Sequence, residues 1–174
     1  MGLDMYLEKM PKIKGYSFDE LIKISNHIAG YNTKEELEKY EKYEEFKPYI
    51  QGRGDYINWF DLREEVGYWR KANAIHRWFV ENIQNNEDDC GYYEISKEQL
   101  IELKEICERI LEATDKDFED VASGLLPTQS GFFFGSTDYD EWYKEDIKST
   151  LEIISKVLEE TDFENNYIMY TSSW

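Results

Sequence analysis

The sequence of 174 residues has few cysteines, histidines and prolines, and it contains no long apolar run. Its two cysteines and two histidines form no CxxC pair and no four-ligand cluster, so a structural zinc site is not expected. No stretch approaches the ~18 consecutive apolar residues of a membrane-spanning helix. The opening segment MGLDMYLEKM lacks the basic and apolar regions of a signal peptide. We therefore expect a cytoplasmic protein with free thiols and no membrane association.

Positive charge is also scarce, because 20 Lys and Arg residues face 38 Asp and Glu residues, for a formal net charge of -18. Such acidity repels nucleic-acid phosphates, so direct binding of nucleic acid is not expected. It fits either an ordinary solvated surface or a protein that binds a basic partner protein by imitating nucleic acid. Aromatic residues make up 16% of the chain, too many for a disordered protein, and the length fits one domain over 1–174.

Hydrophobic periodicity predicts a mainly helical α+β domain with a small sheet that pairs strands near the two ends of the chain. Strands are expected at 3–7, 92–95 and 167–171. Helices are expected at 17–29, 34–46, 68–83, 96–113 and 115–122, and a last one begins after Asp138 or Asp140. Residues 51–55 are expected to form a turn. The last helix has a predicted core stripe of Tyr143, Ile147, Leu151, Ile154 and Leu158.

A stretch without charged residues, GLLPTQSGFFFGST (124–137), is the most unusual segment of this acidic chain. Three consecutive aromatics lie between two glycines, which permit tight turns and close approach of a ligand. Aromatic faces with a few hydroxyl and amide groups typically line small-molecule pockets. We therefore predict a ligand-binding loop with the candidate residues Thr128, Gln129, Ser130, Phe132, Phe133 and Phe134.

The predicted helix 68–83 carries a second group of candidates beside its apolar stripe. Trp69, Asn73 and His76 follow three-to-four spacing, and Arg70 and Arg77 are seven residues apart on a neighbouring flank. Tryptophan can stack on a base and arginine can bind phosphate. In the structural alternative, Trp69 packs in the core, His76 is a satisfied, partly buried histidine, and the arginines pair with Glu64 and Glu65. Both interpretations stay open at this point.

The chain contains no specific catalytic motif. Ser130 lies in QSGF rather than GxSxG, and the glycines around the three phenylalanines do not form a phosphate-binding loop. A metal-assisted hydrolase would use His76 as general base with Asp138 or Asp140 on the metal. Acidic residues at a helix start are, however, expected for capping alone.

Several segments resemble a family of small uncharacterised proteins encoded by bacteriophages and prophages. These are EVGYWRKANAIHRWF (65–79), LLPTQSGFFFGSTDYDEWY (125–143), the opening MGLDMYL and the ending SSW. Residues 13–58 lie outside the resemblance and are interpreted as a variable helical insertion in the single domain. The family implies no fold, substrate or catalytic residue. It implies a setting, the host cytoplasm during infection, where small accessory proteins often counter host defence.

These observations predict an anti-defence phage protein that binds and sequesters a small nucleotide-like ligand without a cofactor. One wall of the pocket would be Trp69, Arg70, Asn73, His76 and Arg77, the other wall would be the six loop residues, and Tyr139 and Trp142 would close it. Two alternatives remain open: a nucleotide hydrolase, and an acidic inhibitor of a host nucleic-acid-binding protein. Self-association into a homo-oligomer is compatible with all three.

Overall fold

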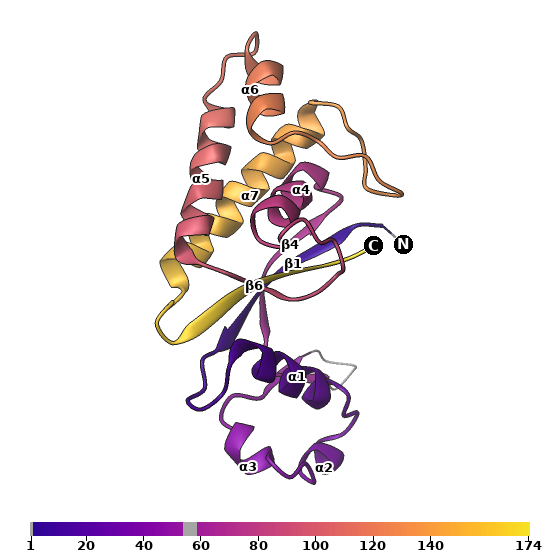
Figure 1. The fold of residues 1–174 in the computed structure, drawn as a ribbon, viewed down its shortest axis with the longest axis vertical. Coiled ribbons are helices and arrows are strands. Elements are labelled where there is room, and N and C mark those ends of the chain that lie inside the picture. Colours follow the sequence, from indigo (N-terminus) through magenta and orange to yellow (C-terminus); the bar gives the residue numbers. More distant parts are fainter. Residues whose placement is uncertain (1, 54–58) are drawn as a thin grey trace.

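A four-stranded antiparallel sheet brings the two ends of the chain together in the computed structural model, which describes residues 2–53 and 59–174 (Figure 1). The strands in spatial order are β4 (Glu64–Arg70), β1 (Asp4–Pro11), β6 (Asn166–Ser173) and β5 (Tyr93–Ile95). β1 and β6 pair along their whole length, with Leu7 opposite Tyr170. The α+β class and the predicted pairing of the terminal strands are confirmed.

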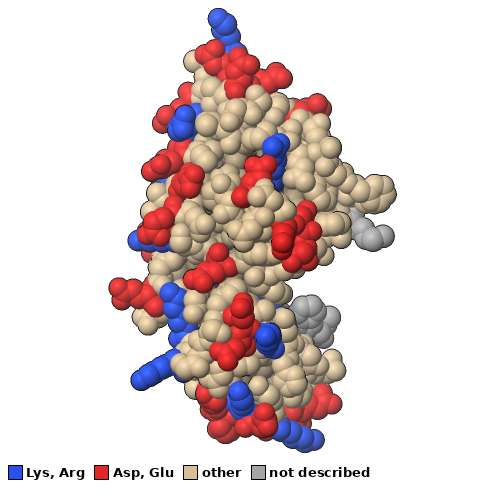
Figure 2. Space-filling model, viewed as in Figure 1, with Lys and Arg blue, Asp and Glu red and all other residues tan. Residues whose placement is uncertain are grey.

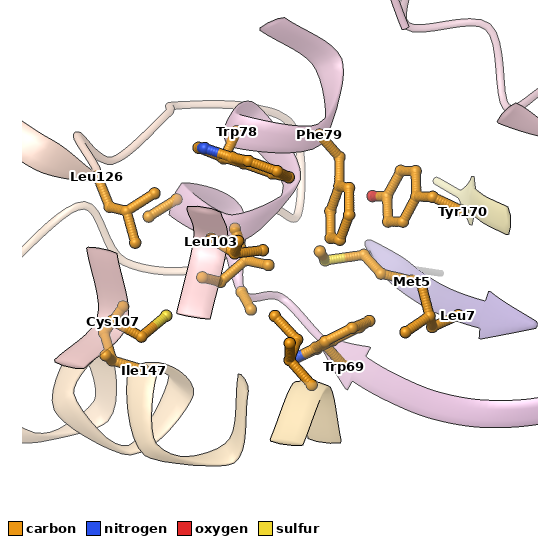
Figure 3. Packing of buried hydrophobic residues seen from close by; sticks show 14 of the residues in the cluster. Met5, Leu7, Trp69, Trp78, Phe79, Leu103, Cys107, Leu126, Ile147 and Tyr170 are labelled. Carbon is orange, nitrogen blue, oxygen red and sulfur yellow. The ribbon is translucent and has the colours of Figure 1, made fainter. Parts of the chain in front are cut away.

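Each face of this sheet carries its own hydrophobic cluster. Successive side chains of a strand point to opposite faces. In β6, Ile168 and Tyr170 belong to the larger cluster and Met169 to the smaller one. Four helices bury the larger cluster: α4 (Asn73–Asn82), α5 (Lys97–Leu111), α6 (Phe118–Leu125) and α7 (Glu141–Glu160). Figure 3 shows this packing, in which the Phe79 ring stacks on Tyr170 with centroids 4.0 Å apart.

The smaller cluster is covered by the part of the chain drawn below the sheet in Figure 1. Its elements are α1 (Phe18–Ala29), α2 (Lys34–Leu37), α3 (Tyr43–Phe46), β2 (Gln51–Arg53) and β3 (Trp59–Asp61). α1 begins as the sequence predicts, because Ser17 and Glu20 form a reciprocal capping box. Most of the segment interpreted as an insertion thus folds over a second small core, which contains Leu21, Ile28 and Phe46.

Two predictions in this region are wrong. The single helix expected at 34–46 is instead two one-turn helices, because the chain turns between them and brings Leu37, Tyr43 and Phe46 into one small cluster. Burial of these three side chains outweighs the modest propensity of a charged helix to continue. A turn is expected at 51–55, but residues 51–53 form strand β2, which pairs with β3. Residues 54 and 55 lie outside the described part of the chain.

A buried ion pair holds the edge of this region against the sheet. The Arg63 guanidinium donates to the Asp61 carboxylate from Nε and from Nη2, each at 2.9 Å, and its Cζ lies over the Tyr92 ring, 4.5 Å from the ring centroid. Asp61 also accepts a hydrogen bond from the Ser25 hydroxyl on α1. Paired in this way, the two charges are tolerated in the interior.

The helix predicted from Tyr68 is also wrong in its first part, because residues 64–70 form strand β4. Burial alternates along this strand, with Gly67 and Trp69 buried and Tyr68 exposed. β4 pairs with β1, where Trp69 lies opposite Met5, and Lys71 then adopts a φ of 63° that ends the strand. Backbone pairing with a distant strand therefore overrides local helix periodicity.

α5 and α7 start where the sequence predicts, whereas α6 starts at Phe118, three residues later than the helix expected at 115–122, because residues 114–117 form a turn that Thr114 and Asp117 close. Ser96 caps α5 in a second capping box with Gln99, and Asp140 caps α7 by accepting hydrogen bonds from the first backbone amides. The core stripe of α7 is confirmed at Tyr143, Ile147 and Ile154. Leu151 and Leu158 are only partly buried, and the residues just before them, Thr150 and Val157, are buried instead. In the part of the chain that the structure describes, every helix is too short or too polar to cross a membrane.

Candidate functional site

Asn73, the first residue of α4, fixes the uncharged segment 124–137, called the neutral loop below. Its side-chain amide donates to the backbone oxygens of Phe134 at 3.2 Å and Ser136 at 2.7 Å. Its Oδ1 accepts from the backbone amide of Gln129 at 2.9 Å. An asparagine amide has two donor hydrogens, and both are used here. Asn73 therefore holds the loop against α4.

The three phenylalanines of the neutral loop point in different directions. Phe134 is buried and meets the His76 ring edge-on, with centroids 5.3 Å apart. Phe132 and Phe133 are 84% and 50% exposed, and Phe133 has a φ of 65°. The predicted contact between the loop and the first turns of α4 exists, but it is made by Phe134 alone among the three rings. The other two rings face solvent.

His76 lies in the middle of a linear chain of hydrogen bonds inside the protein. Its Nδ1 is 2.7 Å from the Tyr170 hydroxyl and its Nε2 is 3.0 Å from Asp88 Oδ2, while Asp88 Oδ1 accepts from the Trp174 indole at 3.0 Å. Burial raises the pKa of Tyr170, which keeps the hydroxyl protonated and able to donate to Nδ1. Since His76 is fully buried and both ring nitrogens have partners, it is a structural histidine.

Trp69 and Arg77 also have structural partners. Trp69 is buried in the core, and its indole nitrogen donates to Thr150 Oγ1 at 2.9 Å. Arg77 pairs with Glu81 one turn along α4 at 2.6 Å, and its Nη1 is 3.5 Å from the backbone oxygen of Thr128. The predicted wall of Trp69, His76 and Arg77 therefore does not form, because β4 and α4 are separate elements rather than one helix.

A cavity of about 280 Å³ opens beside these residues, between the β4–α4 corner, the neutral loop and the start of α7. Its lining residues are Arg70, Lys71, Ala72, Asn73, Ala74, Ile75, Thr128, Gly135, Ser136, Asp138, Asp140, Trp142, Tyr143, Asp146 and Ile147. This volume is near the lower end of the roughly 300–1,000 Å³ of ligand pockets. Three distant segments of the chain thus form one concave site with apolar, cationic and carboxylate groups.

The corner between β4 and α4 is strained and tightly packed against the loop. Lys71 has a φ of 63°, which is unfavourable for a residue with a long side chain. Gly135 faces this corner with a φ of 99°, and a Cβ placed there would lie 3.1 Å from the backbone oxygen of Lys71. Only glycine fits this backbone geometry and close approach, so the Gly135 position explains one of the two glycines that flank the phenylalanines.

The three carboxylates of the cavity differ in their surroundings. Asp138 accepts from the Ser136 hydroxyl at 3.0 Å, and Asp140 accepts from the backbone amides of Trp142 and Tyr143 at 3.0 and 3.1 Å. Asp146 is partly buried, and burial, followed by the charges of Asp140 and Glu145, raises its pKa from 3.8 to about 6. Within residues 2–53 and 59–174, no group of three or more His, Cys, Asp or Glu residues is arranged to hold a metal ion.

The structure brings four of the predicted ligand-binding residues to the cavity: Arg70, Asn73, Thr128 and Trp142. The other predicted binding residues do not line the cavity. Gln129 is bound to Asn73, Ser130 is exposed, and Tyr139 accepts from the backbone amide of Thr128 at 3.2 Å. Asp138 and Asp140, which the sequence suggested only for a hydrolase, do lie on the cavity wall.

Sequence reasoning missed Lys71 and Asp146 as lining residues. Lys71 lies in the segment for which the sequence predicts a continuous helix, whereas the structure places it at the corner between β4 and α4. Asp146 was overlooked although its position suggested it, since it lies between Tyr143 and Ile147 beside the apolar stripe of a helix. An acidic residue in that position is unusual, because carboxylates are rarely buried without a role.

Comparisons with protein-family models, with curated proteins and with solved structures each find no match for this chain.

Proposed function

We propose that this protein binds a small nucleotide-like ligand in the cavity and sequesters it without transforming it. The observation that carries the proposal is the composition of the cavity wall. Arg70 and Lys71 provide cationic groups at the β4–α4 corner, and Trp142 provides an indole at the start of α7 that is 78% exposed. Guanidinium groups bind phosphate in a bidentate manner, and aromatic faces stack on bases.

The hydrogen bonds of the candidate catalytic groups favour binding over hydrolysis. The proposed general base, His76, is fully buried and makes two hydrogen bonds inside the protein. Asp138 and Asp140 bind a loop hydroxyl and the helix start, respectively. A general base must reach the proton that it removes, and His76 cannot do so without disruption of the core.

The face of the molecule drawn in Figure 2 also favours a ligand pocket over imitation of nucleic acid. On the face shown in Figure 2, acidic side chains are separated by Lys and Arg and by wide uncharged areas. A nucleic-acid mimic needs a continuous acidic surface. The acidic residues of this face are therefore consistent with an ordinary solvated exterior.

The resemblance to phage and prophage proteins supplies the biological part of the proposal. In an infected cell, a small cytoplasmic protein that captures a nucleotide messenger would remove the host's alarm signal. Sequestration needs tight binding and no chemistry, which agrees with the absence of a specific catalytic motif in the sequence.

Isothermal titration calorimetry of the wild type against cyclic nucleotides, ADP-ribose-type nucleotides and nucleoside monophosphates tests the proposal. The Arg70→Ala and Trp142→Ala variants should each bind at least ~10-fold more weakly, a loss of about 1.4 kcal/mol. Arg109→Ala on α5 and Phe132→Ala in the loop are matched controls, because both residues are exposed and neither lines the cavity. Chromatography of the released ligand should show it unchanged.

Two results would contradict the proposal. The first is no binding by the wild type across the whole panel. The second is a cavity variant that binds as well as its matched control, which would place the binding site elsewhere on the protein.

A further inference from the structure

Three carboxylates line the cavity, and that of Asp146 is the one without a hydrogen bond or ion pair among the described residues. Asp146 lies on α7 one turn after Trp142, and its side chain is partly buried. Asp138 and Asp140 accept hydrogen bonds from the loop and the helix start. Among the described residues, no hydrogen bond or ion pair reaches the Asp146 carboxylate, although its backbone oxygen accepts from Thr150 at 2.7 Å.

The cationic groups of the cavity do not neutralise this carboxylate. Arg70 and Lys71 line the same space, yet within the described ranges neither forms an ion pair with Asp146. The cavity therefore presents a cationic corner at the end of β4 and, toward α7, the carboxylates of Asp138, Asp140 and Asp146, of which Asp146 alone is without a hydrogen bond among the described residues. A ligand that fits both must carry an anion at one end and N–H donors at the other.

Partial burial makes donors at Asp146 especially favourable. Removal from water raises the pKa of this group to about 6, so at neutral pH the side chain is ionised but poorly solvated. A carboxylate in this state gains more from two good N–H donors than a fully hydrated one does, because there is less water to displace.

We infer that Asp146 recognises the base of the ligand and that the cavity selects guanine nucleotides. Guanine presents a ring N–H and an amino group side by side, which match the two oxygens of one carboxylate. Adenine and cytosine place an acceptor nitrogen beside their amino group, and this lone pair would face the second oxygen. In this arrangement the phosphate lies at Arg70 and the base stacks on Trp142. The inference rests on the proposed function, since it names the ligand of the same cavity.

Calorimetric titration with four ligands, the 5′-monophosphates of guanosine, inosine, xanthosine and adenosine, tests this inference. The wild type should bind the guanosine compound at least ~10-fold more tightly than the other three. Inosine lacks the amino group, and xanthosine replaces it by a carbonyl that repels the carboxylate. Asp146→Asn should lose the guanosine preference and bind the xanthosine compound better, because an amide offers one donor and one acceptor.

Glu145→Gln is the matched control. It removes one negative charge from the neighbouring position, where Glu145 is exposed and pairs with Lys148 at 3.2 Å. This variant should keep the wild-type order of affinities. If Asp146 acted only through the fold or through long-range charge, its replacement would weaken the binding of all four nucleotides alike. It would not change the preferred nucleotide from the guanosine to the xanthosine compound.

The pH dependence of the wild type provides a second measurement that does not depend on the folding of a variant. The guanosine preference needs the ionised carboxylate, so it should be complete above pH ~7 and decline as the pH falls through about 6.

The outcomes separate this inference from the proposal on which it rests. Equal binding of all four nucleotides at every pH would overturn base recognition by Asp146 while the proposed function stands. No binding of any nucleotide, including the cyclic and ADP-ribose-type compounds, would overturn the proposed function itself.

Discussion

The two sides of the first turns of α4 differ in how their polar side chains are paired. We call the side around His76 the closed side and the other the cavity side. On the closed side, around His76, polar groups are buried and paired, with Tyr170, Asp88 and the neutral loop as partners. On the cavity side, the Asp146 carboxylate has no hydrogen bond or ion pair among the described residues, and the Trp142 indole is exposed. Paired polar groups stabilise a fold, whereas unpaired ones lower its stability and are retained where a ligand needs them.

The largest effect should come from the closed side, at His76. Replacement by Ala leaves a cavity and two unpaired polar groups, so the free energy of unfolding should fall by about 3 kcal/mol. His27→Ala is the control, since the other histidine of the chain is exposed on α1, where its ring contacts only the surface rings of Tyr31 and Tyr40 among the described residues, and it should change stability by less than ~1 kcal/mol. Urea denaturation measures both. A loss at His76 no larger than at His27 would break the distinction between the two sides.

Asn73→Ala should produce the second largest loss. It removes three hydrogen bonds that hold the neutral loop to α4, and we expect about 2 kcal/mol. Asn82→Ala at the other end of α4 is the control, because among the described residues its side-chain amide donates only to the backbone oxygen of Trp78, and the residue is exposed. Hydrogen exchange should show faster opening of the loop in Asn73→Ala only. Equal protection in both variants would mean that the loop is held by its other contacts.

Asp146→Asn should have the opposite sign and stabilise the protein. The raised pKa, from 3.8 to about 6, corresponds to ~3 kcal/mol for a fully desolvated group. Partial exposure of the side chain reduces the expected gain to about 1–2 kcal/mol at pH 8. Between pH ~4 and about 6 the native protein holds a proton that the unfolded chain has released, so the wild type loses stability relative to the variant as pH rises.

The measurement is the difference in unfolding free energy between wild type and Asp146→Asn across pH 4–8. The two proteins should converge at the acidic end, and Glu145→Gln should show no such pH-dependent gain. A variant less stable than the wild type at pH 8 would mean that the native carboxylate is paired, and the cavity side would then resemble the closed side.

The smallest effect on stability should be that of Arg70→Ala. Arg70 is exposed at the end of β4 and has no ion pair among the described residues, so the melting temperature should shift by less than 2 °C. The same change should weaken nucleotide binding, as argued above. A clear loss of stability without a loss of binding would identify Arg70 as a structural residue and leave the cavity without its main cation.

The candidate site was predictable only in part, and the errors have one source. The sequence correctly indicated that the neutral loop meets the segment after residue 65. It failed on the direction of the side chains, because Trp69 and Arg70 were assigned to a helix. In a strand, neighbouring residues point to opposite faces, which sends Trp69 into the core and leaves Arg70 exposed. One error of secondary structure therefore displaced the predicted wall from the real cavity.

The sequence by itself determined the features that depend on residues within one turn of each other. Capping boxes at Ser17 and Ser96, the cap at Asp140 and the apolar stripes of the long helices are local patterns, and the structure keeps them. The tertiary structure decided the rest. Residues 64–70 became a strand because β1 was available to pair with them, and the cavity exists only where three distant segments meet. Pairing and packing between distant segments add free energy that no local pattern contains, and here they decided which residues face the cavity.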